Sequence, residues 1–256
     1  MSGELLRVSG MRTMRTLRGN DNVEMSRLYL VPNTISETNE KLLPIYIASE
    51  IKDVRVFFVE APKSSRRLLK SLNAQFPLDD CRFLDLNEHS SPNDVQGYVK
   101  IIKENDAAII SEAGCPCVAD PGADLVLLAH QNQIEIVPLV GPSSIILALM
   151  ASGLSGQNFA FNGYLPKDRQ ERIEKIKISE GRSYKEKQTQ IFMEAPYRNQ
   201  NILEDILTVG QDKTYLCIAY DITGPHQTIK TMSIKEWKKD HFKFDRKPAL
   251  FLIQKI

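Results

Sequence analysis

The sequence has few cysteines and no pattern typical of a zinc site. Its four cysteines (Cys81, Cys115, Cys117 and Cys217) form no CxxC pair and do not combine with the four scattered histidines at metal-ligand spacing. So few cysteines in 256 residues exclude a disulfide framework and favour free thiols in a reducing compartment. Because the chain also shows no apolar run of signal-peptide length near its start, we expect a cytoplasmic protein without a metal ion.

An excess of either charge is also missing. The 33 Lys and Arg residues nearly balance the 32 Asp and Glu residues, and the net charge is +1. This balance argues against a strongly basic protein that coats DNA, but it leaves room for a local basic face. The segment 167–187 carries eight basic residues against five acidic ones. We expect it to form a solvated helix and loop, or a surface that contacts phosphates if the substrate is RNA.

No uninterrupted apolar run is long enough to cross a membrane. The segment 136–166 has no charged residue, but Pro138, Gly141 and Pro142 interrupt it. A buried strand, a tight turn and a buried helix fit this segment better. We therefore expect no membrane partner.

The first half of the chain alternates between strand and helix signals. Apolar runs predict strands at 28–31, 54–59, 82–86 and 107–110, and helical spacing lies between them, as at Val95, Tyr98, Val99 and Ile102. Short connections between such elements predict βαβ units and a mostly parallel sheet. In such a sheet, ligands bind at the carboxyl ends of the strands.

The second half begins with a strand at 134–140 and a helix at 143–152, and later strand signals crowd together with fewer helices between them. Those strands are expected at 159–164, 190–193, 215–220 and 249–253. This change predicts two α/β domains, at 27–132 and 133–256, the second with a mixed sheet. Residues 1–26 show no periodicity and read either as a disordered arm or as residues upstream of a true start at Met25.

Several common catalytic motifs are absent, and one unusual loop is present. The chain has no G-x-G-x-x-G after a strand, no G-x-x-x-x-G-K-[ST], no H-E-x-x-H and no G-x-S-x-G. Residues 111–122 (SEAGCPCVADPG) follow the fourth predicted strand directly and precede a helix at 123–129. A glycine-bearing loop in this place lets the backbone approach a ligand closely, although it is also compatible with a merely tight turn.

This loop resembles the S-[DE]-A-G-x-P-x-x-x-D-P-G segment of the tetrapyrrole methylase family. Four other segments resemble family motifs in the same order: 28–32 (L-Y-[IL]-V-P), 137–144 (V-P-[IL]-P-G-P-[SC]-[AS]), 161–167 (F-x-G-F-L-P-x-K) and 192–198 (F-Y-E-[ST]-P-[HY]-R). Together they span nearly all of residues 28–256. They resemble most the branch that methylates a ribose 2'-hydroxyl in small-subunit ribosomal RNA.

The resemblance implies two α/β domains with S-adenosylmethionine in the cleft between them. It also implies a homodimer, and a cytidine ribose in ribosomal RNA as the acceptor. Carried over motif by motif, it places the cofactor against Pro32, Glu112, Ala113, Gly114, Pro116, Ser143, Ser144, Leu165, Met193, Pro248 and Ala249. Ser143 and Ser144 could instead cap their helix, and Leu165 and Met193 could be core residues.

Methyl transfer to a hydroxyl needs a group that removes the acceptor's proton. Glu60 and Glu88 lie at predicted strand ends and are the candidates, with His89 and Glu112 behind them; the alternative is that each is an exposed loop residue. The strand ends on the substrate side depart from the family pattern, as at Pro32-Asn33-Thr34-Ile35-Ser36, where P-T-P-I-G-N is usual. Two further hypotheses are therefore a methyltransferase for a small molecule such as a tetrapyrrole, and a relative that binds cofactor or RNA without turnover.

Overall fold

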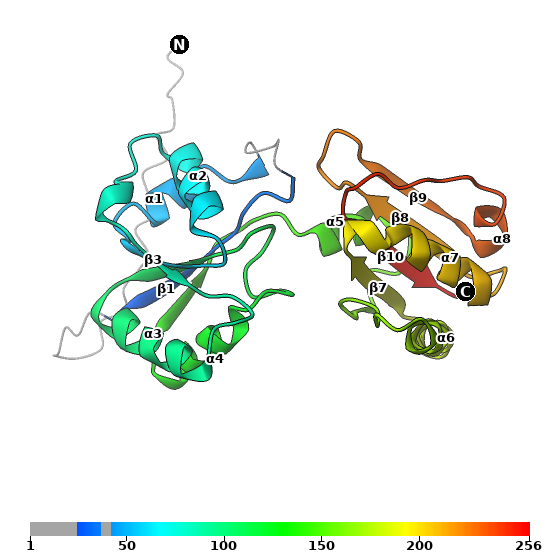
Figure 1. Cartoon of the computed structure of the whole chain (residues 1–256), viewed down its shortest axis with the longest axis horizontal. Helices are drawn as coiled ribbons and strands as arrows, with labels where there is room; N and C mark the ends of the chain where they lie inside the picture. The colour runs from blue at the N-terminus through cyan, green and yellow to red at the C-terminus, as the bar shows by residue number, and fades with distance from the viewer. Residues whose placement is uncertain (1–24, 37–41) are drawn as a thin grey trace, which may run out of the picture.

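A computed structural model describes residues 25–36 and 42–256. The two alternatives for residues 1–26 therefore concern a segment that lies almost wholly outside the described residues. Figure 1 shows two lobes, each built around one five-stranded sheet, and the chain passes once from the first lobe to the second. Two α/β domains were predicted, and the topology agrees.

The first sheet is entirely parallel, as predicted. Its strands are β1 (Arg27–Val31), β2 (Val56–Val59), β3 (Arg82–Asp85), β4 (Ala107–Ile110) and β5 (Glu135–Pro138), in the order β3-β2-β4-β1-β5. The prediction placed residues 133–140 in the second domain. That placement is wrong, because β5 pairs with β1 from Arg27↔Glu135 to Leu30↔Pro138. The first sheet thus extends past the boundary predicted near Asn132.

Helices cover both faces of this sheet. They are α1 (Tyr46–Glu50), α2 (Pro62–Leu72), α3 (Pro92–Glu104) and α4 (Ala123–Gln131), with a short 3-10 turn η2 (Leu78–Asp80). One apolar core joins α1 and α2 to one face, and a second core joins α3 and α4 to the other. Because β2 and β4 are buried on both faces, they read as unbroken apolar runs, VFFV and AAII.

The second domain has a mixed sheet in the order β6-β7-β10-β8-β9, as predicted. Its elements are α5 (Ser144–Ser152), β6 (Phe159–Phe161), α6 (Arg169–Glu186), β7 (Thr189–Glu194), η3 (Pro196–Arg198), α7 (Asn199–Val209), β8 (Tyr215–Tyr220), β9 (Thr228–Ser233), α8 (Ile234–Trp237) and β10 (Ala249–Gln254). Helices α6, α7 and α8 pack on one face of this sheet, and α5 packs on the other. Within the described part of the chain, no helix is long and apolar enough to span a bilayer.

The passage between the domains is tightly packed against β1. A Cβ atom on Gly141 would lie 2.1 Å from the Pro32 Cβ, so only glycine fits there. Two hydrogen bonds also join the domains directly, because Ser36 Oγ donates to the Thr223 carbonyl at 3.1 Å and Thr223 Oγ1 donates to Ser36 Oγ at 3.3 Å. The strand ends of the two sheets are therefore tied together near β1 and β8.

The basic segment 167–187 forms α6, and two of its arginines have structural partners. Arg172 is buried, and it forms an ion pair with the buried Asp205 at 2.7 Å. Arg172 also donates to the carbonyls of Pro166 and Lys167, and Arg169 bonds the other oxygen of Asp205. The interpretation of this segment as an RNA-binding surface is therefore wrong for Arg172, whose guanidinium is used inside the domain.

We predict that Arg172→Ala lowers the free energy of unfolding by about 3–5 kcal/mol, because it leaves the Asp205 carboxylate buried without its main partner. The matched control is Arg182→Ala on the same helix, where the partner Glu186 is exposed. That change should cost less than about 0.5 kcal/mol. Urea unfolding of both variants measures the difference, and equal losses would contradict the structural role of Arg172.

Candidate functional site

Asn33 organises the carboxyl edge of the first sheet. Its backbone N–H donates to the Gly114 carbonyl at 2.9 Å, and the Gly114 N–H donates back to the Asn33 carbonyl at 3.2 Å. Its buried side chain donates to the carbonyls of Ser111 and Glu112 at 3.0 and 3.2 Å. The loop 111–122, which follows β4, is thereby fixed against the end of β1.

The predicted first-domain cofactor residues come together at this edge. Gly114 has φ +69°, and a Cβ atom there would lie 3.3 Å from the Pro142 carbonyl oxygen. Pro32 is buried beneath the same crossing segment, and Pro116 is buried within the loop, while Glu112 and Ala113 are exposed. The structure therefore brings the loop, the end of β1 and the passage to α5 to one place.

Three carboxyl groups cluster beside this loop. Burial, a hydrogen bond to Asp120 and the negative charges of Asp120 and Glu112 raise the pKa of Glu60 to about 7. Asp120 also accepts the backbone N–H groups of Cys117 and Gly122, which holds it in the turn. Ser64, in the first turn of α2, donates to Glu112. A carboxyl group with a pKa near 7 is suited to accept a proton at neutral pH.

The other candidate base lies elsewhere. Glu88 follows β3, the edge strand of the sheet, and its side chain is 86% exposed. It pairs with the equally exposed His89 at 3.6 Å. Because β2 lies between β3 and β4, the structure places Glu60 next to the loop 111–122 and leaves Glu88 and His89 at the margin.

The predicted second-domain residues share one edge of the second sheet. Ala249 at the start of β10 pairs with Glu194 at the end of β7, and the next pair joins Leu250 to Met193. Met193 is half-buried and Pro248 is exposed, whereas Leu165 and Ala249 are buried. The Leu165 side chain belongs to the core between the sheet and α6, so only its backbone is available to a ligand.

Two buried acids and two arginines hold the loop that follows β6. Arg198 pairs with the buried Glu194 at 3.3 Å and donates to the carbonyls of Leu165 and Pro166. Arg172, paired with Asp205, donates to Pro166 and Lys167 as described above. Two fixed arginines therefore set the path of the loop 163–167.

Tyr164 in this loop is affected by the charges of acids from both domains. Its side chain is exposed, and desolvation and the charges of Glu194 and Glu60 raise the pKa of its phenol. Glu194 belongs to the second domain and Glu60 to the first, so Tyr164 lies within the electrostatic reach of both. Together with the Ser36–Thr223 hydrogen bonds, this places the strand edges of the two domains opposite each other.

Ser143 caps α5, because its Oγ accepts the Ile146 N–H at 3.5 Å. Ser144 is the first residue of that helix. Ser143 therefore caps its helix, which was the alternative to a contact with the cofactor. Both residues still follow the crossing segment closely, so their role as cofactor contacts stays a prediction.

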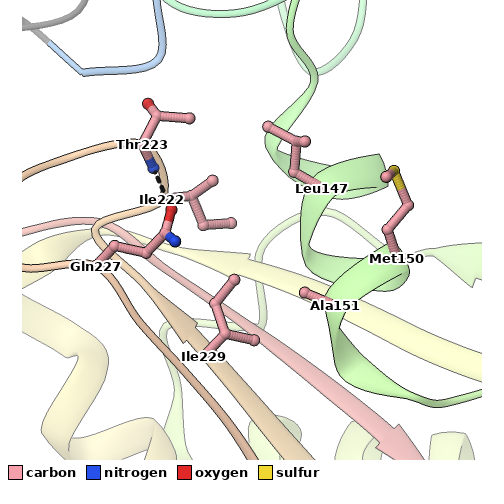
Figure 2. A pocket seen from close by; sticks show the side chains of 7 residues that line it. All are labelled: Leu147, Met150, Ala151, Ile222, Thr223, Gln227 and Ile229. Carbon is pink, nitrogen blue, oxygen red and sulfur yellow. Dashed lines mark hydrogen bonds between the residues drawn. The ribbon is translucent and has the colours of Figure 1, made fainter.

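An apolar pocket of about 350 Å³ lies away from these residues (Figure 2). Leu147 and Met150 of α5 face Ile222 and Ile229 across it, and Gln227 accepts the Thr223 N–H at 2.7 Å. None of the residues predicted to bind the cofactor lines this pocket. It is therefore distinct from the predicted cofactor cleft, although Thr223 belongs to both the pocket and the bridge between the domains.

Three residues of this site were not predicted from the sequence: Asn33, Asp120 and Tyr164. Asn33 stands beside the quoted motif 28–32, and Asp120 stands inside the quoted motif 111–122. For Asn33, the available signal was an asparagine just after the end of a predicted strand. Asp120 was compatible with a merely tight turn, and it does hold that turn, since α4 is capped at Gly122 without a side chain. Tyr164 stands inside the quoted motif 161–167, but nothing in that motif singles it out, because its importance depends on the second domain lying against the first.

Comparisons with known proteins agree with this arrangement. The family model of the Tetrapyrrole (Corrin/Porphyrin) Methylases matches residues 39–238. Two curated relatives, both named Ribosomal RNA small subunit methyltransferase I, are 30% identical to the chain. The match from Vibrio cholerae covers 82% of this chain and 69% of the relative, and that from Thermotoga maritima covers 83% and 90%.

The fold itself is found among solved structures. The crystal structure of diphthine synthase superposes with a TM-score of 0.61, covering 89% of this chain and 90% of that chain at 13% identity. At this identity the likeness shows the fold alone. The fold spans both domains, in agreement with the two-domain architecture expected from the sequence.

We predict that Gly114→Ala weakens S-adenosylmethionine binding by more than tenfold. The added Cβ would crowd the Pro142 carbonyl and disturb the loop 111–122. Gly153→Ala is the matched control, because Gly153 also has a positive φ, +72°, but its Cβ would meet open space. Both substitutions should cost about 1–2 kcal/mol of stability.

Isothermal titration calorimetry and thermal unfolding together measure the two effects. Only Gly114→Ala should lose affinity. If both variants bind S-adenosylmethionine as the unmodified chain does, the loop 111–122 is structural and does not contact the cofactor.

Proposed function

The chain belongs to the tetrapyrrole (corrin/porphyrin) methylase family, and we propose that it transfers a methyl group from S-adenosylmethionine to the 2'-hydroxyl of a cytidine ribose in small-subunit ribosomal RNA. Matches to relatives named for methylation of that RNA, extending over most of the chain, support the substrate. The observation that carries the reaction is the carboxyl cluster around Glu60, at the edge where the two sheets face each other.

The chemistry of this edge fits the cofactor. The sulfonium and ammonium groups of S-adenosylmethionine are cationic, and Glu60, Glu112 and Asp120 surround the loop with carboxyl groups. Gly114 lets the loop backbone pack close to the Pro142 carbonyl of the crossing segment. On the opposite edge, Met193 and Pro248 offer partly exposed apolar surface for an adenine ring. When bound, the cofactor supplies an electrophilic methyl group.

Glu60 is the proposed general base. The acceptor oxygen bonds to the methyl carbon as the carbon–sulfur bond breaks, and the hydroxyl proton passes to a Glu60 carboxylate oxygen. S-adenosylhomocysteine is then the second product. Asp120 and Glu112 assist by raising the pKa of Glu60, so that this carboxylate is a stronger base than an ordinary glutamate. The clamped loops 111–122 and 163–167 align the reacting groups from both sides.

We also propose a homodimer in the cytoplasm, as the family resemblance implies. Val140, Ile146 and Met150 expose apolar side chains at the crossing and on α5, and such side chains are common at protein interfaces. Sedimentation velocity tests the assembly, and a monomer at micromolar concentration would contradict it.

We predict that kcat/KM rises with pH and levels off above about pH 7, because the free enzyme must hold Glu60 as a carboxylate. Glu60→Gln should lower kcat at least a hundredfold. Glu88→Gln is the control and should leave kcat unchanged, since Glu88 is exposed at the margin.

Stability gives a second readout of the same group. The folded state holds the Glu60 proton up to about pH 7, whereas the unfolded chain releases it near pH 4.5, so the native protein loses stability as pH rises between these values. Glu60→Gln should therefore raise Tm at pH 8 and not at pH 4. A pH-independent rate, or a Tm gain equal at both pH values, would contradict the assignment.

The substrate is tested by radiolabelled methyl transfer. We expect incorporation into small ribosomal subunits that lack ribose methylation, and none into carboxylated tetrapyrroles. Incorporation into tetrapyrroles alone would identify a small-molecule methyltransferase. Cofactor binding without transfer to either substrate would identify a relative that has lost turnover.

A further inference from the structure

Helix α2 carries a continuous basic face. Lys63, Arg66, Arg67 and Lys70 are all exposed and stand at i, i+3, i+4 and i+7, so they share one side of the helix. The opposite side, with Ser65, Leu68 and Leu69, is buried against the sheet. No acidic residue interrupts positions 62–72.

Within the part of the chain that the structure describes, the charges on this face lack the ion-pair partners found on other helices. The ion pairs among the described residues include Arg169 and Arg172 with Asp205, Arg182 with Glu186, and Lys238 with Asp212, but none that involves Lys63, Arg66 or Arg67. Like charges three and four residues apart on a helix repel each other and destabilise the helix. A polyanion bound along this side would relieve that repulsion.

The basic face begins at the candidate site. Helix α2 begins at Pro62, two positions after Glu60. Ser64 in the first turn of α2 donates a hydrogen bond to Glu112 of the loop 111–122. Helix α2 lies on the first domain in Figure 1, on one face of its sheet. An anion bound to this face therefore lies close to the carboxyl cluster without entering it.

One side chain of the face is already held in place. The Arg66 guanidinium stacks on the Phe83 ring, 4.4 Å from its centroid. Stacking leaves the edge of the guanidinium free to donate hydrogen bonds, and it reduces the entropy that a ligand must remove. Lys70 is less available, because its Nζ donates to the carbonyls of Ala74 and Phe76.

We propose that Lys63, Arg66 and Arg67 bind consecutive phosphates of the RNA strand next to the nucleotide being methylated. The proposal rests on the proposed function and specifies where its substrate is held. The span from Lys63 to Arg67 is about 6 Å along the helix, which is comparable to the separation between two neighbouring phosphates of an RNA strand. The carboxyl cluster repels phosphates and so directs them to α2 while it receives the neutral ribose hydroxyl.

The test measures binding of unmodified small-subunit ribosomal RNA, made by in vitro transcription, across a series of salt concentrations. Each phosphate contact contributes about 0.7 to the slope of log affinity against log salt. Lys63→Gln combined with Arg67→Gln should reduce the magnitude of the slope of log affinity against log salt by about 1.4. It should also raise KM for RNA. The pair Lys63→Arg and Arg67→Lys, which keeps the charges, should restore the slope.

The matched control is Lys213→Gln combined with Lys239→Gln, outside the basic segment 167–187. Both lysines are exposed, and the change removes the same charge from the other domain. The control should leave the slope unchanged, and S-adenosylmethionine affinity should be unchanged in every variant.

The outcomes separate this proposal from the proposed function. If the unmodified chain methylates ribosomal subunits but the α2 variant keeps its slope and its KM, the α2 surface is wrong and the function stands. If the α2 variant alters only the turnover of a carboxylated tetrapyrrole, the face binds small anions, and both the RNA surface and the proposed substrate are wrong.

Discussion

The hydrogen bonds between Asn33 and the loop 111–122 set the geometry on which the candidate site depends. Buried backbone groups in an irregular loop need partners, and Asn33 supplies them to Ser111, Glu112 and Gly114. With the loop fixed, Gly114 meets the Pro142 carbonyl in the segment that leads to the second domain. One side chain after β1 therefore positions both the loop and the start of the passage between the sheets.

Charge is distributed around this edge according to what each part would bind. Carboxyl groups gather where a cationic cofactor and a hydroxyl proton are expected, and burial, together with the hydrogen bond to Asp120 and the repulsion between these groups, raises the pKa of Glu60 to about 7. Among the described residues, the basic side chains of the neighbouring helix α2 form no ion pair, whereas Arg172 of α6 is used to fix the loop 163–167. A net charge of +1 thus conceals two regions of opposite sign a few residues apart.

The sequence was sufficient for the elements that depend on local pattern. The apolar runs of β2 and β4 predicted buried parallel strands, and the crowding of late strands predicted a mixed sheet. The polar edge strand β9 was missed because TIKTMS has no apolar alternation. The prediction that β5 belongs to the second domain was wrong, because an apolar run predicts a strand but does not indicate which sheet the strand joins.

Long-range partners explain the remaining differences within the site. In the sequence, Arg172 is one more charged residue on a helix that is expected to be solvated. Only the folded structure shows that it lies beside Asp205, which is 33 residues later in the chain. Glu60 and Glu88 look equivalent along the chain, and only the strand order β3-β2-β4 separates a central position from an edge. The motif resemblance pointed to the loops 111–122 and 163–167, but the residues that hold them, Asn33 and Arg198, required the folded structure.

We propose that the cofactor lies between the strand edges of the two domains. Hydrogen–deuterium exchange with and without S-adenosylhomocysteine tests it directly, because it reports protection along the whole backbone. We expect S-adenosylhomocysteine to slow amide hydrogen exchange in both loops, 111–122 in the first domain and 163–167 in the second. Protection confined to one domain, or centred on the pocket between α5 and the β8–β9 connection, would contradict it.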